Sequence, residues 1–161
     1  MDAAAITGEI RAWLRRHPRW VGALFLFCLY MTFVYMPFDI LLKPFYQEIA
    51  RAEDVWFGII LRGWAAKVTE PLHWLVYGAL AFGLWKERAW VWPAAALYVG
   101  QVALAMLVWN VREEGGMGWP GGLVAFALFG ALAVALWQYG SRGSRGSRGS
   151  RADRSASSPP A

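Results

Sequence analysis

Four apolar runs are the feature that most constrains the fold of this chain. They are predicted at about residues 20–42, 67–85, 89–111 and 119–139. A helix rises 1.5 Å per residue, so about 20 residues cross a hydrocarbon core of ~30 Å. Each run is close to that length. The sequence therefore predicts an all-α polytopic membrane protein, in which residues 20–139 form a bundle of four transmembrane helices.

The composition agrees with a bilayer as the solvent. Hydrophobic residues make up 58% of the chain and charged residues only 17%, which is too apolar for a soluble domain of this size. Many of the tryptophans stand near the ends of the apolar runs, where indole rings suit the headgroup region. We predict a multi-pass protein of a bacterial inner membrane or an ER-type membrane.

The second apolar run extends further than one span requires. Residues 55–85 would form a helix of roughly 46 Å. We therefore expect the crossing to begin around Lys67. The preceding residues 55–66 would be an interfacial or partly inserted helix, and Pro71 a kink or a first-turn residue.

Basic residues predict the topology of the ends. Eleven of the sixteen lysines and arginines lie before the first span, in the 86–88 turn or after residue 139. The positive-inside rule then places both termini in the cytoplasm. Residues 1–19 are predicted to be a basic interfacial segment. Residues 140–161 carry GSR repeats that cannot bury a core, so this tail is predicted to be disordered.

Several classes of function are excluded by the residues present. The net charge is +5, but the basic residues flank the spans, so no nucleic-acid partner is predicted. The single cysteine, Cys28, has no Cys or His at ligand spacing near it. No metal site and no cofactor-binding motif is therefore predicted.

Charged and polar residues gather at the predicted external ends of the first and second spans. The set comprises Asp39, Arg62, Lys67, Glu70 and His73. Helical spacing puts the members from Lys67 onward roughly on one side of a helix, together with Tyr77. Antiparallel packing of the two spans would bring the set together, and a polar group at membrane depth is a candidate for function.

Two interpretations of this cluster stay open. In the first, Glu70 or Asp39 is a general acid or base and His73 passes a proton. In the second, Lys67 and Glu70 anchor a helix start, where a carboxylate is favoured by the helix dipole. Asp39 would then form an interfacial ion pair with Lys43.

Aromatic, amide and cationic residues are the predicted ligand contacts around the cluster. They are Tyr35, Arg62, Trp64, Lys67, Trp74, Tyr77, Gln101, Trp109 and Asn110. Aromatic faces stabilise a cation. The two amides have a simpler alternative role as hydrogen-bond donors between helices.

Three segments resemble helices of the EXPERA domain, the four-helix membrane fold shared by the emopamil-binding sterol isomerase and the sigma-2 receptor. These segments are FVYMPFDILL, VWFGIILRGWAAKVTEPLHWLVYGALAF and LYVGQVALAMLVWNV. The resemblance covers about residues 33–139. It implies an enclosed apolar cavity for a sterol-like or other lipid amphiphile, and double-bond isomerisation as the activity.

The chain departs from the isomerase pattern at positions that matter for chemistry. The resemblance aligns the family's histidine and two glutamates with Tyr35, Asp39 and Arg62. An arginine stays protonated and cannot be a general base. Either Glu70 has taken over the acid–base role, or this chain binds a ligand without converting it.

The functional prediction is a membrane protein that binds a sterol-like or other lipid amphiphile. If it is an enzyme, it isomerises a double bond with Glu70, Asp39 and His73 as catalytic groups. The alternative is a non-enzymatic membrane subunit or assembly factor whose charges anchor helix ends. A homodimer is compatible with both.

Overall fold

The computed structural model describes residues 2–42, 48–49 and 52–156. Lys43, the predicted partner of Asp39, lies outside the described residues. The chain is mostly helical and divides into two compact units. The first comprises Met1–Asp54 with Leu61–Arg88, and the second comprises Val55–Ile60 with Ala89–Ala161.

The first unit begins with α1, Ala3–Arg16, within the predicted interfacial segment. The Asp2 side chain caps this helix by accepting a hydrogen bond from the Ala4 amide at 3.3 Å. Trp13 is buried, and its ring centroid lies 4.6 Å from that of Phe25. One face of α1 is therefore packed against the helix that follows.

A helical stretch from Arg19 to Leu41 forms the first long apolar segment. It consists of α2 (Arg19–Tyr30), the π-helical η1 (Met31–Tyr35) and α3 (Met36–Leu41). Pro37 explains the wider turn, because a proline has no N–H to donate and its ring crowds the preceding turn. The carbonyl oxygen of Thr32 accepts a hydrogen bond from the Trp74 indole at 2.7 Å.

A β-hairpin follows where the sequence predicted an interfacial helix. β1 (Glu53–Trp56) pairs with β2 (Ile59–Arg62). The two residues between them, Phe57 and Gly58, have φ of 49° and 81°, the backbone of the tight hairpin turn that suits twisted strands. The all-α prediction is therefore wrong for these residues. Aromatic and β-branched side chains on both sides of the turn favour the pleated conformation.

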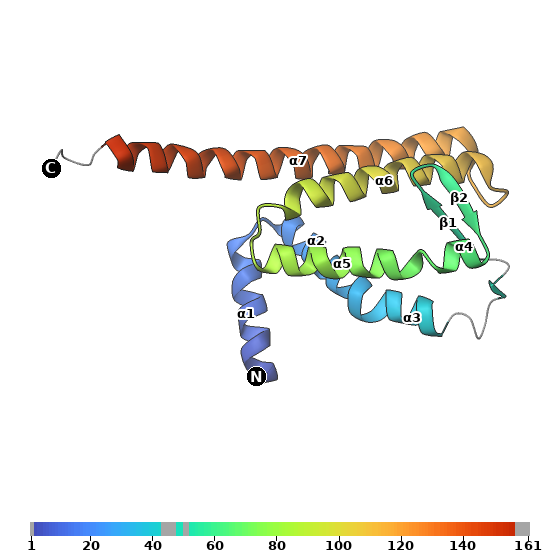
Figure 1. The fold of residues 1–161 in the computed structure, drawn as a ribbon, viewed down its shortest axis with the longest axis horizontal. Coiled ribbons are helices and arrows are strands. Elements are labelled where there is room, and N and C mark those ends of the chain that lie inside the picture. The colour runs from blue at the N-terminus through green and yellow to red at the C-terminus, as the bar shows by residue number, and fades with distance from the viewer. Residues whose placement is uncertain (1, 43–47, 50–51, 157–161) are drawn as a thin grey trace. The chain divides into compact units, whose positions relative to one another are not determined.

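Two helices complete the first unit. α4, Trp64–Lys67, is a single turn, and α5, Glu70–Trp85, carries Pro71 in its first turn. α5 packs against α2, η1 and α3, and α2 and α3 are seen beside it in Figure 1.

The second unit is dominated by a helical hairpin. α6 (Val91–Arg112) packs along α7 (Gly118–Ala156) (Figure 1). The helices approach closely at Gly122, where an added Cβ would lie 3.1 Å from the main-chain oxygen of Leu107. At the other end of α6, the rings of Trp92 and Tyr139 are 4.7 Å apart.

The GSR repeat is the last part of α7. The composition of residues 140–161 predicts a disordered tail, whereas the structure continues the helix to Ala156. The repeat contains no proline before Pro159 that would end a helix. Its glycines cost about 1 kcal/mol each in helix propensity. We therefore do not expect the GSR repeat to form a stable helix in isolation.

Within the described residues, three helical stretches are long and apolar enough to cross a bilayer, as expected of a multi-pass integral membrane protein. They are Arg19–Leu41, Val91–Arg112 and Gly118–Arg142. They agree within a few residues with three of the predicted spans. α5, at the place of the remaining span, has 16 residues, so its length of about 24 Å falls short of a ~30 Å core.

Candidate functional site

The predicted polar cluster lies where α4 gives way to α5. Val68 and Thr69 form a turn between the two helices, and Glu70 begins α5. Pro71 fits the first helical turn because its missing N–H would have no partner there. The polar residues of the cluster lie at this break in the helix.

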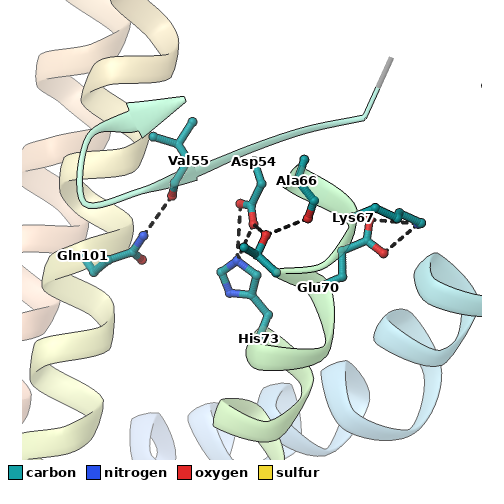
Figure 2. A network of polar contacts seen from close by, with 8 residues as sticks. Asp54, Val55, Ala66, Lys67, Glu70, His73 and Gln101 are labelled. Carbon is teal, nitrogen blue, oxygen red and sulfur yellow. Dashed lines mark hydrogen bonds and ion pairs between the residues drawn. The ribbon is translucent and has the colours of Figure 1, made fainter. Parts of the chain in front are cut away.

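Lys67 is the centre of the first polar network. Its Nζ donates a hydrogen bond to Glu70 Oε1 at 2.9 Å and forms an ion pair with Oε2 at 2.6 Å. It also donates to the main-chain oxygen of Asp39 at 2.9 Å. Both charged side chains are only 13% exposed. The ammonium therefore holds the Glu70 carboxylate as its counterion (Figure 2). Its bond to the Asp39 oxygen also joins the start of α5 to α3.

Asp39 and Tyr35 do not share an environment, although they are four residues apart, about one turn of an α-helix. Asp39 is 8% exposed, whereas Tyr35 is 41% exposed. Tyr35 ends the π-helical η1, and its ring lies 6.5 Å from that of Tyr30. The π turn of η1 contains an extra residue, so Tyr35 is rotated away from the face it would share with Asp39 in a regular α-helix.

His73 belongs to a second network, centred on Asp54 of β1. His73 Nε2 lies 3.1 Å from Asp54 Oδ2 and 3.3 Å from Oδ1 (Figure 2). Thr69 Oγ1 lies 2.5 Å from Asp54 Oδ2 and 2.6 Å from the main-chain oxygen of Ala66. A hydroxyl has one proton, so it donates to one of these oxygens at a time. The carboxylate beside His73 is therefore Asp54.

Sequence reasoning had not included Asp54 or Thr69 in the site. Predicting Asp54 would have required recognising the β-hairpin, because β1 brings Asp54 beside the start of α5. Side-chain exposures of 17% for His73 and 19% for Asp54 leave the pair partly screened from water. Such a pair can orient an imidazole for proton transfer or fasten β1 to α5. No group of three or more potential metal ligands occurs among the residues described.

Arg62 and Trp64 lie on the hairpin side of the cluster. Arg62 is in β2 and contacts Glu53 of β1, with Nε and Oε1 3.4 Å apart. Its side chain is 62% exposed. Trp64 begins α4 and is 69% exposed. This contact of Arg62 joins the two strands of the hairpin.

Trp74 and Tyr77 fasten α5 to the preceding helices. Trp74 donates its indole N–H to the carbonyl oxygen of Thr32. The Tyr77 ring meets Phe27 edge-on, with centroids 5.9 Å apart. Both residues were predicted to contact a ligand, and in the structure both contact the preceding helices.

Gln101, Trp109 and Asn110 belong to the second unit and contact parts of that unit. Gln101 is buried and donates to the main-chain oxygen of Val55 at 2.9 Å (Figure 2). Asn110 is also buried, donates to the Met106 oxygen at 2.8 Å and accepts from the Met117 amide at 3.2 Å. Trp109 packs over the 113–116 turn, near Gly115. The amides act as structural hydrogen-bonding groups of α6.

An apolar groove runs between α1, α2–η1 and α5 in the first unit, with a volume of about 390 Å³. Its apolar walls are formed by Phe25, Leu29, Phe33, Ala81, Phe82 and Trp85. Thr32 and Gly78 line it further along the helix pair, and the charged residues Glu9 and Lys86 also line it. Of the described residues that line the groove, none is a predicted site residue.

The groove follows from matching helix faces. Phe25, Leu29 and Phe33 recur at i, i+4 and i+8, and Gly78, Ala81, Phe82 and Trp85 recur at helical spacing on α5. Small residues at Gly78 and Ala81 leave space that larger residues would fill. The periodicity was visible in the sequence, but the pairing of the two faces was not.

No protein-family model, curated protein or solved structure matches this chain. The resemblance to the EXPERA domain therefore rests on the residues that carry it.

Proposed function

We propose that this chain is an integral membrane protein that binds one lipid amphiphile in the groove of its first unit. The groove itself is the observation that supports this function. Its volume of about 390 Å³ lies within the range of small-molecule sites, about 300–1,000 Å³. That space accommodates one acyl chain or a sterol-like body.

An amphiphile fits the lining better than a wholly apolar molecule. Aromatic and aliphatic side chains form the walls, while Glu9 and Lys86 add a carboxylate and an ammonium. An apolar chain would pack against Phe25 and Phe82 through van der Waals contacts, and a polar end would meet the charges. The resemblance to a family of amphiphile-binding proteins supports the same class of ligand.

The proposed topology has four crossings with both termini in the cytoplasm. Residues 64–85 contain α4, a two-residue turn and α5. As a nearly continuous helical path they reach roughly 33 Å, enough for a ~30 Å core. The excess of basic residues near the termini and in the 86–88 turn supports this orientation.

Binding without conversion of the ligand is the form of the proposal that the contacts favour. An isomerase needs a proton donor and a proton acceptor within hydrogen-bond reach of its ligand. Glu70 is paired with Lys67, His73 lies against Asp54, and the groove is lined by other residues. We therefore propose a lipid-binding protein and assign the two polar networks to holding α5 in place.

A groove-filling substitution tests this function. A Cβ added at Gly78 would lie 3.7 Å from Thr32 Cγ2, an ordinary contact, so Gly78→Leu adds bulk to the groove at little cost to the backbone. Native mass spectrometry of protein purified in mild detergent should show one bound lipid on the wild type. Gly78→Leu should reduce that occupancy by about tenfold, the equivalent of losing ~1.4 kcal/mol of binding.

Gly130→Leu is the matched control, because a Cβ at Gly130 of α7 meets nothing within 4 Å. This variant should keep the lipid. Equal lipid occupancy in wild type and Gly78→Leu would contradict the proposal. Recovery of a stoichiometric protein partner in place of lipid would favour the membrane-subunit alternative.

A further inference from the structure

Two opposite charges line the groove without meeting each other. Glu9 is an exposed residue of α1, and Lys86 is an exposed residue just after α5. Neither side chain makes an ion pair within 4.0 Å among the residues that the structure describes. A carboxylate and an ammonium are therefore held beside one cavity with space between them.

Several other charged residues of the same unit form ion pairs. Glu87, next to Lys86, lies 3.7 Å from the His17 ring nitrogen. Lys67 is paired with Glu70, and Arg62 contacts Glu53. Glu9 and Lys86 differ from these paired residues because each lines the cavity and neither has a counterion within 4.0 Å among the described residues.

We propose that the groove binds a glycerophospholipid whose headgroup is a primary aminoalkyl phosphate. This inference rests on the proposed lipid-binding function and adds the headgroup class. Lys86 would donate to the phosphate oxygens, and Glu9 would accept from the ammonium of the same headgroup. Both contacts are charge-assisted hydrogen bonds, which are stronger than neutral ones.

The proposed contacts discriminate among common headgroups. A trimethylammonium group has no N–H, so it cannot donate to Glu9. A glycerol or serine headgroup adds hydroxyl or carboxylate groups, and a net negative headgroup would be repelled by the Glu9 carboxylate. Of these headgroups, only a primary ammonium joined to a phosphate diester can donate to Glu9 and accept from Lys86 without carrying a net negative charge.

The position of the charges suits such a lipid. Lys86 follows the C-terminal end of α5, beside Trp85, and Trp85 lines the groove. Lysine and tryptophan at a helix end are typical of the depth at which headgroups lie. An acyl chain would then extend along Phe25 and Leu29 toward Phe33.

The test is a competition among three phospholipids with identical acyl chains. Wild-type protein is equilibrated in detergent micelles with equal amounts of phosphatidylethanolamine, phosphatidylcholine and phosphatidylglycerol, and bound lipids are counted by native mass spectrometry. One exposed charge pair is worth up to ~1 kcal/mol, so we expect about fivefold preference for the ethanolamine lipid over each competitor.

The variants separate the two contacts. Glu9→Gln should remove the preference for the ethanolamine lipid over the choline lipid. Lys86→Gln should weaken the binding of all three phospholipids by about fivefold. Arg88→Gln and Glu114→Gln are the matched controls, because both residues are exposed and neither lines the groove. These controls should keep the wild-type preference.

Wild-type protein that retains the three lipids equally, while Gly78→Leu still loses them, would overturn the headgroup assignment and leave the lipid-binding function standing. Unchanged lipid occupancy in Gly78→Leu would overturn both.

Discussion

Lys67 shows how one residue can join two helices. Its ammonium contacts the Glu70 carboxylate and the main-chain oxygen of Asp39, and it is mostly shielded from solvent. A shielded ion pair contributes little net stability, but removal of one partner leaves a charge without compensation. The pair therefore specifies the α3–α5 arrangement more than it stabilises it.

Replacement of Lys67 by methionine should lower the free energy of unfolding by about 3 kcal/mol, because Glu70 would remain shielded and unpaired. The double variant Lys67→Met/Glu70→Met should recover most of that loss. Reversible unfolding in mixed micelles measures both. Arg62→Gln is the control and should change stability by less than about 0.5 kcal/mol, since that ion pair is solvent-exposed. Wild-type stability of Lys67→Met would contradict this role.

The contact between His73 and Asp54 is predicted to be an energetic coupling between β1 and α5. Asp54→Ala, His73→Phe and the double variant form a double-mutant cycle. We expect a coupling energy of about 1 kcal/mol, because the side chains are partly shielded and hydrogen-bonded. The cycle is measured by the same unfolding titration. Strict additivity would show that the contact contributes nothing.

At the scale of elements, α6 and α7 depend on glycine at a position where their backbones approach closely. A Cβ at Gly122 would lie 3.1 Å from both Leu107 Cδ1 and its main-chain oxygen. The main-chain oxygen belongs to a helix and cannot rotate away. The separation of the two helices is therefore fixed by a glycine.

Gly122→Val should destabilise the α6–α7 hairpin by about 1–3 kcal/mol through overpacking. Gly130→Val, with no atom within 4 Å of the added Cβ, should be neutral within about 0.5 kcal/mol. Thermal unfolding followed by circular dichroism in one detergent compares them. Equal effects at the two positions would mean that the close approach does not limit packing.

The long apolar elements could be predicted from the sequence, and the short ones could not. Hydropathy and length identified Arg19–Leu41 and the two helices of the second unit. The hairpin was missed because residues 55–62 are as apolar as a membrane helix, and two four-residue strands give little alternation to read. Gly58 was only a weak turn signal, because Phe-Gly is not among the dipeptides typical of two-residue hairpin turns.

Only part of the polar site could be predicted. Helical spacing predicted that Lys67 and Glu70 lie together, and they form a hydrogen bond. Asp39 meets Lys67 only through its main-chain oxygen among the contacts described. The partner of His73 depended on the hairpin, so Asp54 was missed. The groove depended on which faces of α2 and α5 meet, which no local pattern specifies.

At the scale of the whole molecule, the proposed binding site lies within one compact unit. Every described residue that lines the groove comes from the first unit. The second unit supplies two of the three long apolar helices. Ligand binding is therefore assigned to α1, α2–η1 and α5, and the α6–α7 hairpin is assigned to the membrane scaffold.

Saturable photolabelling of the groove tests the lipid-binding account most directly. A phospholipid with a photoreactive acyl chain is titrated into detergent-solubilised protein, and labelled residues are mapped by mass spectrometry. We predict labelling of Phe25 and Leu29, which line the groove and are less exposed than Leu128, and this labelling should saturate and be competed by unlabelled phospholipid. Labelling of Leu128, 68% exposed on α7, should rise with lipid concentration and resist competition. Unsaturable labelling of the groove, indistinguishable from that of Leu128, would contradict the account.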